Sequence, residues 1–264
     1  MKKYIFMAVA GMLALSSCSN DDNDVQNTQN APRQMTFTAG FGDGATTRAS
    51  LSGYSVTFDA PDYISIFSAN NNNVQFTTTA GGASATFTGT ATAGDPTYYA
   101  VYPYKDSYTF SAGVVSGVVI PYNQSAAAYS DCGWDPNAAI AYATTTGSSL
   151  QFHNACALLK VTNNTGEAAN IMINKSSSGE GFTGAFNLNT STGALTCTNH
   201  FSEIDVYGVP NSKTIYIAVA PGTYEDFRAS AFLSEDIKMK EKSSVTFVKG
   251  KIYDLGNVSD WDGH

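Results

Sequence analysis

The chain of 264 residues is 43% hydrophobic and 12% aromatic, with only 14% charged residues; this is enough apolar material for a core and excludes intrinsic disorder. Its net charge of −8 leaves no broad basic surface for phosphates, so nucleic acid is not an expected partner. The 15 Tyr and 15 Phe, set among many Thr, Ser, Asn and Gly, are typical of an exported all-β protein.

The first residues predict an export signal. Lys2 and Lys3 precede an apolar stretch, 5–15, that suits the core of a signal peptide and is too short to span a bilayer as a helix. The tetrapeptide that ends at Cys18, Leu-Ser-Ser-Cys, resembles a bacterial lipobox. The resemblance implies that residues 1–17 are removed and that the Cys18 thiol carries a lipid anchor. The alternative is an ordinary secreted protein in which Cys18 lies near the cleavage point by chance.

Residues 18–34 contain almost no side chain to bury and are predicted to form a flexible tether. The acidic run 21–24 directly follows Cys18. It resembles the surface-export signal of Bacteroidetes lipoproteins, which implies the outer face of the outer membrane. The alternative interpretation is a solvated spacer that carries no export signal.

A first series of short strands follows the tether. It opens with a two-residue alternation that sets Met35, Phe37, Ala39 and Phe41 on one face of a strand. Turn-forming residues separate the later members. These are predicted at 55–58, 63–68, 74–78, 85–89, 98–102 and 114–120. The Ala-rich region 123–143 is predicted to be irregular or briefly helical.

A second series is predicted at 150–153, 157–163, 169–174, 184–187, 213–220, 227–233, 244–247 and 251–255. Two strand series joined by a weakly patterned stretch indicate two β-sandwich domains, at 35–146 and 147–264. After the last strand only a short polar segment, 256–264, remains, so a long C-terminal donor strand is not expected.

No residue pattern indicates catalysis, a metal or a cofactor, and the chain is not expected to be an enzyme. The three His residues, His153, His200 and His264, show no metal-ligand spacing. The string Gly179, Gly181, Gly184 matches the pattern of a dinucleotide loop, but no helix follows it.

Three cysteines remain besides Cys18, at positions 132, 156 and 197, with no CxxC pair among them. At most one disulfide can form within the chain. We expect three buried thiols, because free cysteine is often a small core residue.

Several segments, taken in order, resemble the fimbrillin-like proteins of Bacteroidetes. These are the lipobox, the strand 35–41, the segments 47–49, 63–67 and 99–104, and, in the second half, 152–160, 217–221 and 247–255. The resemblance implies a pilus subunit of two transthyretin-like Greek-key β-sandwich domains in tandem. It implies further that the subunit is exported as a lipoprotein and joined to other pilin subunits by strand exchange.

The resemblance also implies that a surface protease specific for Arg or Lys cuts near the first strand. The loss of that strand would open a groove for a strand of another subunit. Arg48 is the candidate cleavage residue, because it lies in a polar, unpatterned segment that a protease can enter. Arg33 is the alternative, and a third interpretation is that Arg48 is a solvated residue that is never cut.

Three hypotheses about function stay open. The first is a polymerising pilin that serves adhesion, as a tip or accessory subunit. The second is an uncleaved surface lipoprotein, either a fimbrial anchor or a module that binds a host or bacterial surface ligand through aromatic loops around Tyr102, Tyr104, Tyr108 and Trp134. These four aromatics are alternatively core residues. The third, a hydrolase, lacks a catalytic cluster.

Overall fold

The structure is a computed structural model that describes residues 31–42, 57–125, 133–175 and 181–263. The described chain is built from β-strands, with one 3-10 turn, η3 (Val258–Asp260), and no α-helix among these residues. The prediction of an all-β protein is therefore confirmed. The predicted signal peptide, Cys18, Arg48 and Cys132 lie outside the described residues.

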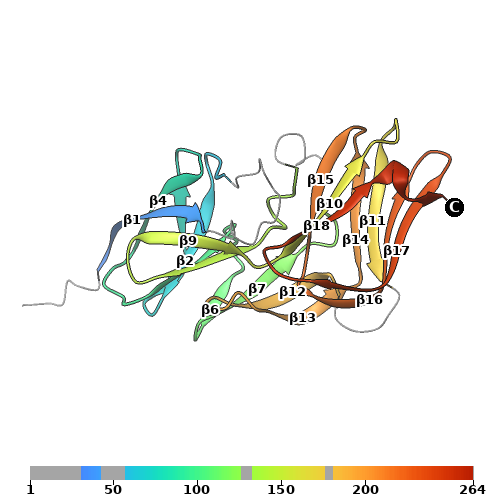
Figure 1. The fold of residues 1–264 in the computed structure, drawn as a ribbon. Coiled ribbons are helices and arrows are strands. Elements are labelled where there is room, and N and C mark those ends of the chain that lie inside the picture. Colours follow the sequence, from blue (N-terminus) through green and yellow to red (C-terminus); the bar gives the residue numbers. More distant parts are fainter. Residues whose placement is uncertain (1–30, 43–56, 126–132, 176–180, 264) are drawn as a thin grey trace, which may run out of the picture.

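The first sheet closes on itself as a barrel at one end of the molecule (Figure 1). Each strand is bonded to the next, and the last to the first, in the order β1 (Pro32–Phe41), β4 (Ser84–Thr92), β3 (Asn71–Thr78), β2 (Tyr63–Ser68), β5 (Tyr98–Tyr102), β8 (Ala141–Thr145) and β9 (Ser149–Asn154). The closing pair, β1 with β9, covers residues 38–41 of β1, so the barrel has no free edge strand. Its core is mainly aromatic and alanine, with Phe37, Phe58, Phe76, Phe87 and Phe152 buried inside.

Three further sheets make up the rest of the described chain (Figure 1). A three-stranded sheet has the order β15 (Lys213–Val219), β10 (Ala157–Asn163), β18 (Ile252–Asn257). A five-stranded sheet has the order β14 (Glu203–Val209), β11 (Ala169–Lys175), β16 (Gly222–Phe232), β17 (Ile237–Phe247), β19 (Asp262–Gly263). A four-stranded sheet has the order β13 (Leu195–Phe201), β12 (Thr183–Asn189), β7 (Val114–Ile120), β6 (Thr109–Ser111).

Strand pairing crosses residue 146 in both directions. Strand β9, which follows residue 146, pairs with β1 and β8 of the barrel. Strand β7, which precedes it, pairs with β12 of the second half. One hydrophobic cluster also joins the two ends, because Phe67 and Val101 of barrel strands pack in it together with Phe186 and Tyr216. The division into domains at residue 146 stays a prediction.

Most predicted strands coincide with observed ones, and 63–68, 98–102, 114–120 and 157–163 match them to the residue. The interpretation of 123–143 as irregular or helical was wrong at its end, where β8 begins at Ala141 and pairs with β5. Strands β6, β13, β14 and β19 were not predicted. In β13 most side chains are exposed, so the hydrophobic alternation that marks a half-buried strand is absent.

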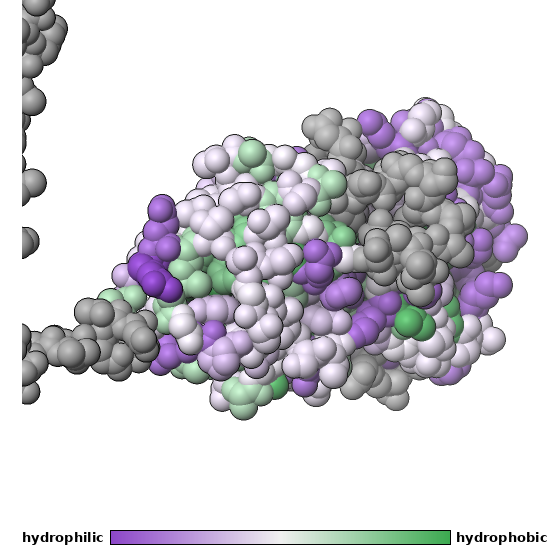
Figure 2. Space-filling model, turned by 60° about the vertical axis from the view of Figure 1, so that its left-hand side comes forward, coloured by the Kyte–Doolittle hydropathy of each residue, from purple (hydrophilic) through white to green (hydrophobic). Residues whose placement is uncertain are grey.

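The hydropathy of the protein surface reflects the amino-acid composition of the chain. In the view of Figure 2, residues of intermediate hydropathy cover most of the described face. Such a surface is expected from a chain rich in Thr, Ser, Ala and Gly, with few charged residues.

Two groups of residues that the sequence singled out have packing roles. Cys156 is buried, and this burial raises the pKa of its thiol to about 12. Cys197 is half-buried, so the expectation of buried thiols is met only by Cys156 among the described cysteines. Gly184 lies in β12 with φ +128°, and a Cβ there would come within 2.1 Å of the Asn199 carbonyl oxygen. Close contact between β12 and β13 thus explains this glycine.

Candidate functional site

The candidate site is the first strand, β1, together with the barrel wall that holds it. On one side β1 pairs antiparallel with β4, from Pro32 opposite Thr92 to Gly40 opposite Ser84. On the other side it pairs parallel with β9, from Thr38 opposite Ser149 to Phe41 opposite Phe152. Beyond its end, the Gly42 backbone N–H still donates to the Phe152 carbonyl oxygen at 2.8 Å. Strand β1 is therefore an interior strand of the barrel: it is paired on both sides over residues 38–40, with β9 alone at Phe41, and with β4 alone before Thr38.

One face of β1 points into the barrel core, as the alternation in the sequence predicts. Phe37 and Ala39 are each 1% exposed, while Met35 and Phe41 are half-buried against the same cluster. The Phe37 ring meets the rings of Phe76 and Tyr98 edge-on, with 5.4 Å between centroids in both cases. These contacts make Phe37 the central anchor of the strand.

The far end of the strand is held by a second aromatic group. The Phe41 ring stacks on Phe58 with centroids 5.1 Å apart and lies 6.0 Å from Phe152 and 6.3 Å from Tyr102. Phe58 lies near the start of the next described stretch and is bridged to Gly82. Without β1, the rings of Phe58, Phe76, Tyr98 and Phe152 would line an open apolar groove.

The two candidate cleavage residues stand in different relations to β1. Arg33 lies within the strand, opposite Ala91, with its side chain exposed. It is not in front of the strand, as the sequence suggested. Arg48 is outside the described residues, in the stretch of chain between Gly42 and Phe58. A cut after Arg33 would leave Met35–Phe41 attached to the barrel, whereas a cut after Arg48 would separate all of β1 from the rest of the chain.

The aromatic residues that the sequence offered as a ligand site belong largely to the core. Tyr108 is 3% exposed, and Trp134 packs against two hydrophobic clusters. Tyr102 packs on Phe41 inside the barrel wall, and its hydroxyl donates to the Asp62 carboxylate at 3.3 Å. Tyr104 is half-buried. Exposed aromatics lie elsewhere, at Tyr63, Tyr122, Phe201, Tyr207 and Phe232. Phe201 and Tyr207 lie in strands that periodicity alone did not reveal.

The described residues contain no group of His, Cys, Asp and Glu side chains placed to hold a metal ion. His153 lies near the end of β9 beside the Tyr142 ring, at 5.8 Å between centroids, and His200 is exposed in β13. Within the same residues, no helix has the length and apolar character that crossing a membrane would require.

Fold and site together define an all-β protein in which a barrel is closed by an N-terminal strand. No protein-family model matches the sequence, and no curated protein sequence does. Among solved structures, the chain is similar to a "putative cell adhesion protein" from Bacteroides ovatus, with a TM-score of 0.55 and 12% identity over 89% of this chain and 96% of that one. A protein of the same description from Bacteroides uniformis gives a TM-score of 0.54 and 16% identity over 84% of this chain and 92% of that one. The fold is thus shared with these Bacteroides proteins, in agreement with the resemblance that the sequence motifs carry.

Proposed function

We propose that this protein is a non-enzymatic, fimbrillin-like pilus subunit of the bacterial cell surface that serves adhesion. In this proposal it consists of two transthyretin-like Greek-key sandwich domains and is exported as an outer-membrane lipoprotein anchored through Cys18. A surface protease specific for Arg or Lys removes β1, and a strand of another pilin subunit replaces it. The observation that carries the proposal is the position of β1 between β4 and β9, with its own side chains Phe37 and Ala39 buried in the barrel core.

The physical argument rests on what the loss of β1 would expose. The facing edges of β4 and β9 would lose their backbone partners, and unpaired sheet edges bind extended segments readily. The side chains of Phe37, Met35 and Phe41 gain on the order of 5 kcal/mol from burial, as an upper estimate. A donor strand with the same alternation would recover both contributions.

Arg48 fits the proposed cleavage better than Arg33. Only a cut after β1 frees the whole strand, and Arg48 follows β1 in the sequence whereas Arg33 lies within it. A cut after Arg48 would also release the lipidated residue, Cys18, together with β1. The proposal therefore couples release from the membrane to the opening of the groove.

The C-terminal segment supports a tip or accessory position rather than a stalk position. Trp261 is 5% exposed, and its indole N–H donates to the Leu255 carbonyl oxygen at 3.0 Å. Strand β19 then pairs with β17 at Lys238 and Met239. Because this segment is bonded within its own subunit, it is a poor donor for a neighbour.

The proposal is tested by limited digestion of the mature protein with an Arg-specific protease. Intact mass should show one cut, with a product that begins at Ala49. Size-exclusion chromatography with light scattering should then show assembly once the β1 fragment is displaced. An excess of a synthetic peptide of residues 32–41 should block this assembly, because the peptide fills the groove again.

Two matched variants locate the cut. Arg48→Gln should abolish both cleavage and assembly, whereas Arg33→Gln should leave both unchanged. Assembly by uncut Arg48→Gln protein, or a cut that unfolds the barrel, would contradict the proposal.

The second candidate function is an uncleaved surface lipoprotein, either a fimbrial anchor or a monomeric ligand-binding module. The observation in its favour is that the barrel is already complete, with β1 bonded on both sides. A protein that resists the protease at Arg48 and stays monomeric would support this alternative.

A further inference from the structure

The outer face of the five-stranded sheet carries a row of polar side chains that crosses four strands. The strand register sets Glu203 of β14 opposite Asn174 of β11, Asn174 opposite Arg228 of β16, and Arg228 opposite Glu241 of β17. Neighbouring strands lie about 4.8 Å apart, so the row extends roughly 14 Å. Carboxylate, amide and guanidinium groups thus alternate along one line on an open surface.

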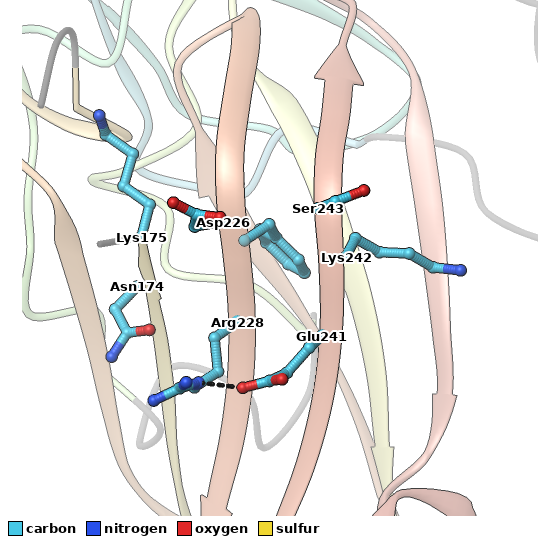
Figure 3. A pocket seen from close by; sticks show the side chains of 8 residues that line it. Asn174, Lys175, Asp226, Arg228, Glu241, Lys242 and Ser243 are labelled. Carbon is cyan, nitrogen blue, oxygen red and sulfur yellow. Dashed lines mark hydrogen bonds and ion pairs between the residues drawn. The ribbon is translucent and has the colours of Figure 1, made fainter. Parts of the chain in front are cut away.

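This row borders a hollow of about 630 Å³. Figure 3 shows Asn174 and Arg228 side by side on neighbouring strands, with Glu241 joined to Arg228, and with Asp226 and Lys175 toward the other end of the same strands. Lys242 points away from this group (Figure 3). The hollow is therefore rich in groups that donate and accept hydrogen bonds.

Three exposed aromatic residues lie on or beside β14, the strand that carries Glu203. Tyr122 and Phe201 are both 49% exposed with ring centroids 5.6 Å apart, and Tyr207 is 56% exposed. Tyr122 is held beside β14, because the Asp205 backbone N–H donates to its carbonyl oxygen at 2.7 Å.

The aromatic group adjoins Glu203 at the end of the polar row: Tyr207 lies on the same strand, β14, and Glu203 and Tyr122 both act electrostatically on the Tyr207 hydroxyl. The Lys175 backbone N–H donates to the carbonyl oxygen of Ser202 at 3.2 Å, and Ser202 directly follows Phe201. The Tyr207 hydroxyl donates to the Asp205 carboxylate at 3.3 Å, and the negative charge of Asp205 raises the pKa of Tyr207. The Tyr207 hydroxyl thus donates to Asp205, while its oxygen can accept a hydrogen bond from a ligand.

The charges of the region favour an uncharged ligand. The Arg228 guanidinium is already paired with the Glu241 carboxylate at 2.5 Å, and Glu203 and Asp205 add negative charge beside the aromatics. Acidic and basic groups are thus interspersed, so an anion or a cation would meet repulsion as well as attraction. A ligand with many hydroxyl groups can use all of these partners at once, while aromatic rings cover its apolar C–H faces.

We infer that this continuous surface, from Glu241 and Arg228 through Asn174 and Glu203 to Phe201 and Tyr122, binds a neutral oligosaccharide. The inference rests on the proposed adhesive function and adds to it the class of ligand that is bound. Binding itself requires no cleavage and belongs to the single subunit. The far end of the molecule, where β1 closes the barrel, takes no part in it.

The test uses the uncut Arg48→Gln protein, which cannot assemble by the proposed route. It is applied to an array of immobilised neutral, sialylated and sulfated oligosaccharides, and each positive neutral oligosaccharide is then titrated by isothermal calorimetry. We expect binding to at least one neutral structure. Asn174→Ala and Phe201→Ala should each weaken it about tenfold, the effect of one lost hydrogen bond or stacking contact.

Matched controls lie on the barrel. Asn72→Ala removes an exposed amide on β3, and Tyr63→Ala removes an aromatic ring that is 40% exposed on β2. Both should bind as the parent protein does. A double variant, Arg228→Gln and Glu241→Gln together, places amide groups at both positions of the row and removes the ion pair between them. It should weaken binding with little change in the melting temperature, because an exposed ion pair contributes little stability.

The inference is overturned by the absence of binding to every neutral oligosaccharide, by binding to acidic oligosaccharides alone, or by binding that the Asn174 and Phe201 variants leave unchanged. None of these outcomes bears on assembly, which the digestion of the wild-type protein measures separately. A failure of assembly likewise leaves the binding result intact.

Discussion

At the scale of single residues, Asp95 is the most connected carboxylate of the barrel. It accepts hydrogen bonds from the Ser68 hydroxyl at 2.5 Å, from the side chain and backbone of Asn70 at 2.5 and 3.1 Å, and from the Asn71 side-chain amide at 3.3 Å. Burial alone acts to raise the pKa of Asp95, but the bonds from Ser68 and Asn70 outweigh it and lower the pKa below its ordinary value. The ionised form therefore ties the β2–β3 turn to the segment that leads into β5.

We predict that Asp95→Asn destabilises the protein at neutral pH by about 1 kcal/mol, the scale of hydrogen bonds to a partly exposed charged group. Because the folded pKa is lowered, the contribution of Asp95 is present above its unfolded pKa and is lost as the pH falls through the folded value. The difference between wild type and variant should thus shrink below about pH 4.

Urea unfolding between pH 2 and pH 7 measures this difference, with the exposed Glu235→Gln as control. A difference that stays constant down to pH 2 would contradict the assigned role of Asp95.

At the scale of elements, β1 differs from its neighbouring strands because, under the proposed function, a strand of another subunit replaces it. Phe37 of β1 and Phe87 of β4 lie opposite each other and are both buried. They are equivalent in the uncut protein but not after strand exchange, because only Phe87 would remain in the assembled subunit. A comparison of substitutions at these two residues therefore distinguishes the strand that is removed, β1, from the strand that is retained, β4.

We predict that Phe37→Ala and Phe87→Ala each lower the free energy of unfolding of the uncut protein by about 3–4 kcal/mol, since both leave a cavity in the core. After cleavage and assembly, only Phe87→Ala should still lower the thermal stability. Scanning calorimetry of both forms makes the comparison. Equal losses in the assembled form would mean that β1 had not left.

The inward face of β1 could be predicted from sequence, because strict alternation reports which side chains share a face. The strands that pair with β1 could not be predicted from sequence. Strand β9 reaches β1 from residues 149–154, and no local pattern states which distant strand completes a sheet. Strands β13 and β14 were not predicted for a different reason: exposed side chains such as Tyr207 interrupt the alternation that marks a buried face.

At the scale of the whole molecule, the two ends share structure. The barrel needs β9 from the second half of the chain, and the four-stranded sheet needs β7 from the first. The cluster that contains Phe67, Tyr142 and Tyr216 is built from both. Such shared packing favours cooperative unfolding of the described chain.

We predict that a fragment ending at residue 146 does not fold, because it lacks β9 and leaves β1 and β8 without their neighbour. The mature protein should unfold in one transition by calorimetry, whereas the fragment should show neither a transition nor dispersed NMR signals. A fragment 35–146 that unfolds cooperatively would instead establish an independent first domain.

The sequence determines the class of the protein, the strand-forming segments and the inward side chains of β1, because composition, two-residue alternation and turn residues act locally. It also carries the motifs that resemble the fimbrillin-like family. Barrel closure by β9, the packing of Tyr108 and Trp134 in the core clusters, and the gathering of Tyr122, Phe201 and Asn174 on one surface depend on tertiary structure. They do so because each brings together segments far apart in the chain, and the free energy of such contacts depends on the packed geometry and not on any local pattern.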